Sequence, residues 1–188
     1  MSCIKDGYVH QRHDGIRDLI GTTAKEVSSD VEVEPHLIPS NEQPDESRLD
    51  LSIRDFWQRG QKAFLDIRIC NPYAPTLRQL SLKKLLENNE KEKKRKYGRR
   101  VVDIEHGSFS PVVFTAFGGC SRETEKVLAV LTSKLSEKRK IDRSVVAGWL
   151  NTKLSFALLR AAILCVLKGN KGSNKKERRS GKYRNSSI

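Results

Sequence analysis

Apolar and polar positions in the first 70 residues follow patterns that predict one helix and three short strands. Over 12–28, Ile16 and Ile20 recur at helical spacing, which indicates an amphipathic helix. Residues 30–35 alternate between apolar and polar, as a strand with one solvated face does. Two apolar runs then follow, RLDLSIRDFW and AFLDIRIC, separated by the polar QRGQK. This arrangement predicts a β-hairpin with Gly60 in or near its turn.

The rest of the chain predicts a helix, an apolar strand and two further helices. Residues 80–97 are predicted to form the helix that follows the hairpin. The apolar run SPVVFTAFGG is continuous enough for a strand covered on both faces. Residues 121–137 open with a serine that can cap a helix. The last run predicts a long apolar helix, capped near Asp142 or Ser144 and ended by Gly169. This order of elements predicts an α/β fold with a mixed central sheet, helices on both faces and a C-terminal helical pair.

Length and composition place most of the chain in one domain. The 188 residues divide into an N-terminal arm over 1–11, an α/β domain over 12–167 and a disordered basic tail over 168–188. No run of about 18 apolar residues occurs, so we expect no transmembrane helix and no membrane partner. The N-terminus lacks the apolar region of a secretory signal. The four scattered cysteines indicate neither a disulfide framework nor a self-contained zinc site.

The positive charge is concentrated in two segments. Residues 83–100 hold nine basic and three acidic side chains, and residues 168–188 hold eight basic and one acidic, which together account for the net charge of +13. Clustered lysines and arginines favour a polyanionic partner, DNA or RNA, because they release counterions from its phosphates. For 83–100 alone, a solvated helix face is an equal alternative. The tail is typical of a disordered arm or a nuclear-import signal and predicts a nuclear location.

Two acidic residues stand among apolar neighbours in the two arms of the predicted hairpin. Asp50 lies in RLDLS and Asp66 in FLDIR. A carboxylate in a half-buried strand is costly unless it is paired. If the hairpin aligns the two acids, they converge on one side of the sheet, where a hard cation such as Mg²⁺ or Mn²⁺ would stabilise them. The alternative is that they form ordinary surface ion pairs with Arg48, Arg54 or Arg68.

The order of these motifs resembles the PD-(D/E)xK, restriction-endonuclease-like superfamily. It is most similar to the endonuclease domain of site-specific non-LTR retrotransposons and to related mobile-element proteins. The resemblance runs from about residue 10 to residue 168. It is carried by Arg12–His13, Leu49–Asp50, AFLDIRICNPYA around Asp66, the helix end with Lys93, Lys96 and Tyr97, and SPVVFTAFGG at 110–119.

The chain departs from the superfamily pattern at two positions. No proline precedes Asp50, and Arg68 stands where the superfamily often has lysine. Arginine does not deprotonate, so it replaces a catalytic lysine poorly. In the retrotransposon branch the lysine lies on the following helix, and Lys93 matches that place. A lysine at that helix end can reach back over the sheet edge toward the two acids.

The resemblance implies metal-dependent hydrolysis, by nicking, of a DNA phosphodiester. Asp50 and Asp66 would hold Mg²⁺ or Mn²⁺, and Lys93 would orient the attacking water or stabilise the transition state. The alternative is a catalytically inactive nucleic-acid-binding module of the same fold. A third hypothesis is a scaffold that uses the helix over 144–167 for protein contacts. The implied substrate-binding residues are Arg68, Tyr97, Lys94, Lys96 and, in a supporting role, His13. Glu105 and His106 are candidate accessory ligands, although a position at a strand edge is the favoured interpretation.

Overall fold

A computed structural model describes residues 8–39, 48–74 and 79–180, and the structural account is confined to them. Helices and strands alternate in the first two thirds of the chain, and two long helices follow. The elements are α1 (Tyr8–Lys25), β1 (Val31–Val33), β2 (Leu51–Arg54), β3 (Lys62–Cys70), α2 (Leu82–Lys93), the π-helix η1 (Lys94–Gly98), α3 (Arg99–Asp103), β4 (Ser108–Thr115), α4 (Arg122–Arg139) and α5 (Arg143–Ser180).

The four strands form one mixed sheet in the order β1-β2-β3-β4. The first three strands are antiparallel, whereas β4 runs parallel to β3. A parallel pair needs a crossover connection, and α2, η1 and α3 provide it. Gly60 has a φ of +82° in the turn between β2 and β3, a conformation that favours glycine. The structure thus confirms both the hairpin and a mixed sheet flanked by helices.

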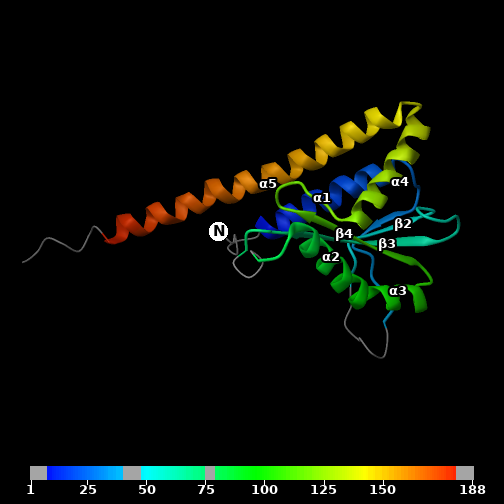
Figure 1. Cartoon of the computed structure of the whole chain (residues 1–188), viewed down its shortest axis with the longest axis horizontal. Helices are drawn as coiled ribbons and strands as arrows, with labels where there is room; N and C mark the ends of the chain where they lie inside the picture. Colours follow the sequence, from blue (N-terminus) through cyan, green and yellow to red (C-terminus); the bar gives the residue numbers. More distant parts are fainter. Residues whose placement is uncertain (1–7, 40–47, 75–78, 181–188) are drawn as a thin grey trace, which may run out of the picture.

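Helices cover both faces of the sheet, with α1, α4 and α5 above it and α2 and α3 below it in Figure 1. The alternation of side chains along β3 explains why both faces are apolar. Leu65 and Ile67 point toward α1, where they pack against Ile16 and Ile20. Phe64, one position away, belongs to a separate cluster on the other face. Its members are Leu37, Leu49, Phe64, Tyr97 and Val101.

The strand β3 is longer than its partner β2, and this difference creates a bare strand edge. The pairing of β2 with β3 ends at Leu51, opposite Leu65. Asp50 precedes the last paired residue of β2, and its backbone N–H still donates to the carbonyl oxygen of Leu65, the residue before Asp66. Within the described residues, positions 67–70 of β3 pair with β4 alone. Their outer edge faces the first turns of α1 instead of another strand.

Two segments differ from the sequence-based expectation. Residues 99–103 form the short helix α3, which completes the crossover before β4 begins at Ser108. Glu105 and His106 therefore lie in the loop after α3, so their expected place at a strand edge is wrong. The second difference concerns α5, which continues through Gly169 to Ser180. An internal glycine costs a helix only about 1 kcal/mol, and the lysines and arginines that follow Gly169 are good helix formers.

The described helices include none with a stretch long and apolar enough to span a bilayer. The apolar residues of α5 are interrupted by Lys153 and Arg160. Several apolar residues of α5, among them Leu150 and Leu154, belong to the main hydrophobic core.

Candidate functional site

Asp50 is held at the point where β2 ends and the bare edge of β3 begins. Its backbone N–H donates to the carbonyl oxygen of Leu65 at 3.1 Å, which fixes it in the ladder. Its side-chain Oδ2 then accepts a hydrogen bond from the backbone N–H of Ile67, the first unpaired amide of that edge. The carboxylate therefore replaces the missing strand. Its side chain is 16% exposed, so one side of it remains open to solvent.

His13 approaches the same point from α1. Its Nε2 lies 3.2 Å from Asp50 Oδ2 and 3.1 Å from the carbonyl oxygen of Ile67. Both partners are acceptors, so Nε2 carries a proton. The hydrogen bond to Asp50, helped by its charge and by Asp14, outweighs desolvation and raises the pKa of His13 to about 9. At neutral pH the ring is an imidazolium that neutralises Asp50.

Asp66 lies on the α2 face of β3 and is almost completely buried, with a side chain that is 7% exposed. Lys93 reaches it from the end of α2, and its Nζ lies 2.6 Å from Asp66 Oδ2. Burial raises the pKa of Asp66, and the Lys93 ammonium opposes this rise. The negative charge of Asp50 raises the pKa of Asp66 further, so Asp50 lies close enough to interact electrostatically with Asp66. The structure thus brings Lys93 to Asp66, as expected, while the Asp50 carboxylate contacts His13 of α1 and the backbone of Ile67.

One buried oxygen of Asp66 has a single polar contact. Lys93 Nζ lies 2.6 Å from Oδ2. Within the described part of the chain, this buried Oδ2 accepts no further hydrogen bond. Because a carboxylate oxygen has two lone pairs, Oδ2 can accept a further ligand beside Lys93.

The π-helix explains how Lys93 and Tyr97 come to face the sheet together. The buried residues Leu85, Leu86 and Asn89 define the sheet-facing side of α2, and Lys93 follows one turn later. A regular α-helix would rotate later residues at four-residue spacing away from that side. The wider turn of η1 keeps Tyr97 buried against the sheet. Such turns occur frequently at functional sites.

Tyr97 is anchored in the apolar cluster below the sheet, and two lysines surround its ring. The ring packs against Phe109 at a centroid distance of 5.8 Å. The Nζ atoms of Lys93 and Lys96 lie 5.6 and 4.7 Å from the Tyr97 centroid. A hydrogen bond with Tyr97 raises the pKa of Lys96. Tyr97 therefore holds two ammonium groups near Asp66.

Other candidates lie in different surroundings. Arg68 pairs with Glu92 at 2.9 Å. Because Glu92 directly precedes Lys93 in the chain, Arg68 lies at the border of the site. Lys94 points toward α4 and lies 3.4 Å from Glu123, away from Asp66.

The arginines considered as alternative ion-pair partners of the two acids contact other carboxylates instead. Arg54 binds Asp30 at 2.7 Å, and Arg48 lies 3.9 Å from Glu34. Glu105 accepts a hydrogen bond from the Ile38 N–H at 2.7 Å and so serves the loop after α3.

The two carboxylates fit a Mg²⁺ site of the kind that water and phosphate complete. Mg²⁺ is commonly held by one or two protein carboxylates together with water and substrate phosphates. Asp66 offers a buried oxygen whose one polar contact in the described residues is Lys93, and Asp50 offers a second carboxylate close enough to influence the pKa of Asp66. In the described residues, no group of three His, Cys, Asp or Glu side chains is arranged to hold a metal. Such a site would therefore depend on the substrate for some of its ligands.

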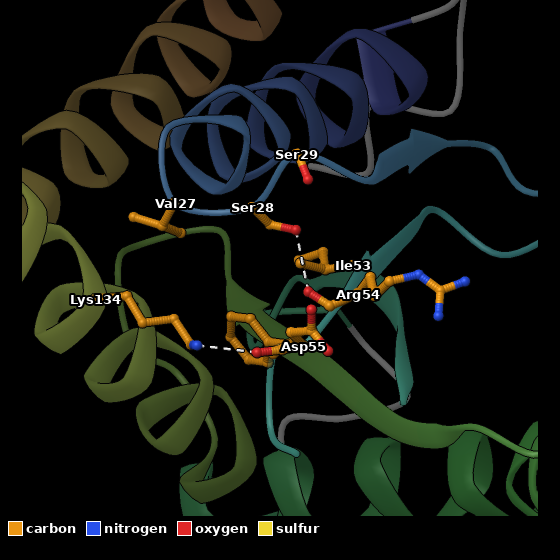
Figure 2. A pocket seen from close by; sticks show the side chains of 8 residues that line it. Val27, Ser28, Ser29, Ile53, Arg54, Asp55 and Lys134 are labelled. Carbon is orange, nitrogen blue, oxygen red and sulfur yellow. Dashed lines mark hydrogen bonds between the residues drawn. The ribbon is translucent and has the colours of Figure 1, made fainter. Parts of the chain in front are cut away.

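A pocket separate from this cluster lies at the turn end of the hairpin, lined by residues that follow α1, by the end of β2 and by α4. It has a volume of about 150 Å³. Lys134 points into it, but its Nζ donates to the carbonyl oxygen of Asp55 at 2.9 Å. Figure 2 shows this contact and the Arg54 side chain pointing away from Lys134. Lys134 and Arg54 already have partners, so this pocket is a weaker candidate for a functional site than the cluster around Asp66.

The backbone of Ile67 and the side chain of Glu92 belong to the site but were not expected from the sequence. The lengths of the two hairpin arms contained a signal for Ile67. If Asp50 is aligned with Asp66, the first arm has only Leu49 and Arg48 left to pair with the residues after Asp66. No comparable pattern pointed to Glu92, because it lies among many alternating charges.

Comparison of the sequence with protein-family models and with curated proteins finds no match. The functional conclusion therefore depends on the chemistry of the residues gathered at the bare edge of β3.

Proposed function

We propose that this chain is a metal-dependent, restriction-endonuclease-like domain of mobile-element origin that nicks DNA by hydrolysing a phosphodiester. The observation that carries the proposal is the buried Asp66–Lys93 pair at 2.6 Å, one strand away from Asp50. A buried acid beside a second acid and a lysine is a common arrangement at hydrolytic metal sites. The mixed sheet and the helices on both faces agree with the expected core.

In this proposal each side chain has a separate task. Asp50 and Asp66 would hold Mg²⁺, which supplies an activated water and neutralises charge on the phosphate. With a cation held at Asp66, the Lys93 ammonium would no longer be needed to balance the charge of that carboxylate. Lys93 would then donate a hydrogen bond to the attacking water or to a phosphate oxygen. His13 keeps Asp50 oriented, and Lys96 adds positive charge beside Lys93.

A catalytically inactive nucleic-acid-binding module remains the second candidate, and one observation favours it. Each of the two acids already has a cationic partner within the chain, His13 for Asp50 and Lys93 for Asp66. An inactive descendant of a nuclease would retain such internal ion pairs in place of a metal. The two basic segments, 83–100 and 168–188, would serve either function.

A plasmid-nicking assay with a matched variant tests the proposal. The wild-type chain should nick supercoiled plasmid in Mg²⁺ or Mn²⁺ but not in EDTA. Asp66→Asn keeps the shape of the side chain and should lower the rate at least about 100-fold, since it removes a metal ligand. Asp103→Asn removes an exposed carboxylate of α3 and should leave nicking unchanged.

Calorimetry distinguishes the two candidate functions. A nuclease should bind Mn²⁺ in a manner that Asp66→Asn abolishes. An inactive module should bind DNA with a steep dependence on salt but show no such metal binding. Absence of cleavage with every divalent metal, together with absence of metal binding, would contradict the nuclease proposal.

A further inference from the structure

Among the partly buried arginines that the structure describes, Arg12 is distinctive because it has no hydrogen-bond or ion-pair partner. It lies in α1, one residue before His13 and one turn before the fully buried Ile16. Its side chain is partly buried, and its Nε is shielded from solvent without a hydrogen-bond acceptor. Across residues 8–39, 48–74 and 79–180, no ion pair or hydrogen bond to Arg12 is formed.

The other arginines that are not fully exposed all have acceptors. Arg17 contacts three carboxylates, and Arg139 contacts both oxygens of Glu26. Arg68 pairs with Glu92, and Arg100 donates to the carbonyl oxygen of Ile38 at 2.9 Å. Arg100 Nε is also buried without an acceptor, but another nitrogen of the same guanidinium has one. Among the described arginines that are not fully exposed, Arg12 is therefore the one with no acceptor on any guanidinium nitrogen. A shielded guanidinium without an acceptor is unfavourable, so an anion that supplies acceptors would bind it with a net gain.

The Arg12 guanidinium lies near the bare edge of β3, residues 67–70. The next residue, His13, contacts Ile67 at the start of that edge. At its other end is Cys70, a buried thiol whose pKa burial raises, while the charges of Arg68 and Arg12 oppose that rise. Arg12 therefore lies near residues 67–70, next to the paired acids.

We propose that Arg12 binds a backbone phosphate of DNA beside the phosphodiester held at Asp50 and Asp66. This inference rests on the proposed function and extends it to the mode of substrate binding. The planar guanidinium presents N–H groups in a fixed fork that matches two phosphate oxygens. A DNA strand lying along the bare edge of β3 would bring successive phosphates to the acids and to Arg12.

DNA binding in EDTA tests the inference without any need for cleavage. The affinity of a labelled duplex is measured over a range of salt concentrations for the wild-type chain and for Arg12→Gln. Loss of one phosphate contact should reduce the slope of log affinity against log salt by about 0.9 and weaken binding roughly tenfold. Arg12→Lys keeps the charge and should retain most of the slope.

The matched control is Arg59→Gln, which removes an exposed arginine from the turn at the far end of the hairpin. It should leave the slope unchanged. Because Arg12 has no partner in the fold, Arg12→Gln should also unfold at or above the wild-type temperature. A slope equal to that of Arg59→Gln, or a clearly lower unfolding temperature, would overturn the assignment.

The result is independent of the nicking assay. A chain that nicks no DNA but shows the reduced slope in Arg12→Gln would contradict only the nuclease proposal. A chain that nicks DNA but has an unchanged slope in Arg12→Gln would contradict only the role of Arg12.

Discussion

Asp66 and Lys93 form the most deeply buried ion pair in the described part of the chain, with side chains 7% and 18% exposed. Burial raises the native pKa of Asp66 above its value in the unfolded chain. The native state therefore binds this proton more tightly, and the contribution to stability is largest in acid. It is lost as the pH rises through the native pKa. An acid that weakens the fold at neutral pH is typical of a functional site.

His13 should give the fold a pH dependence in the alkaline range. Its pKa is raised from 6.5 to about 9, so its contribution to stability is complete below pH 6.5 and is lost between pH 6.5 and about 9. For a side chain that is 28% exposed, we expect a loss on the order of 2–3 kcal/mol. Urea unfolding in EDTA should show this loss in the wild-type chain and not in His13→Gln. Parallel curves for the two proteins would contradict the prediction.

The elements show which features could be predicted from local sequence. The hairpin was predictable because apolar alternation and the Gly60 turn fix its two arms, and this placed Asp50 near Asp66. The reach of Lys93 was predictable because α2 is the next element after β3 and Lys93 lies at its end. The π-turn of η1 was not, because it depends on packing of Tyr97 against the sheet. The link from Asp50 to Ile67 depends on unequal strand lengths, which no single segment reveals.

The edge strand β4 offers a test of how the elements are joined. Thr124 of α4 is fully buried, and its Oγ1 accepts from the Val113 N–H at 2.7 Å. Thr124→Val preserves the shape but leaves that N–H without an acceptor, which should cost about 1–3 kcal/mol. Thr124→Ser keeps the hydroxyl and should cost at most about 1 kcal/mol for the lost methyl group. Chemical denaturation compares the two variants, and an equal loss in both would contradict this assignment.

At the scale of the whole molecule, the proposed site and the strongest charge lie on different elements. The site is built from α1, β2, β3 and α2, whereas α5 extends well beyond the sheet toward its C-terminal end (Figure 1). The segment 168–188 carries eight basic residues and one acidic residue. Charge of this kind strengthens binding to any DNA sequence but does not position a phosphodiester at Asp66.

A chain that ends at Leu167 separates these two contributions. It should bind duplex DNA more weakly, and the slope of log affinity against log salt should fall by at least about 2, because several phosphate contacts are lost. Nicking at saturating protein should keep the same requirement for metal and for Asp66, since the acids and Lys93 remain. Binding titrations and plasmid nicking by the same preparation measure both quantities. An unchanged slope would show that the basic end does not contact DNA, and loss of nicking at saturation would place part of the site on it.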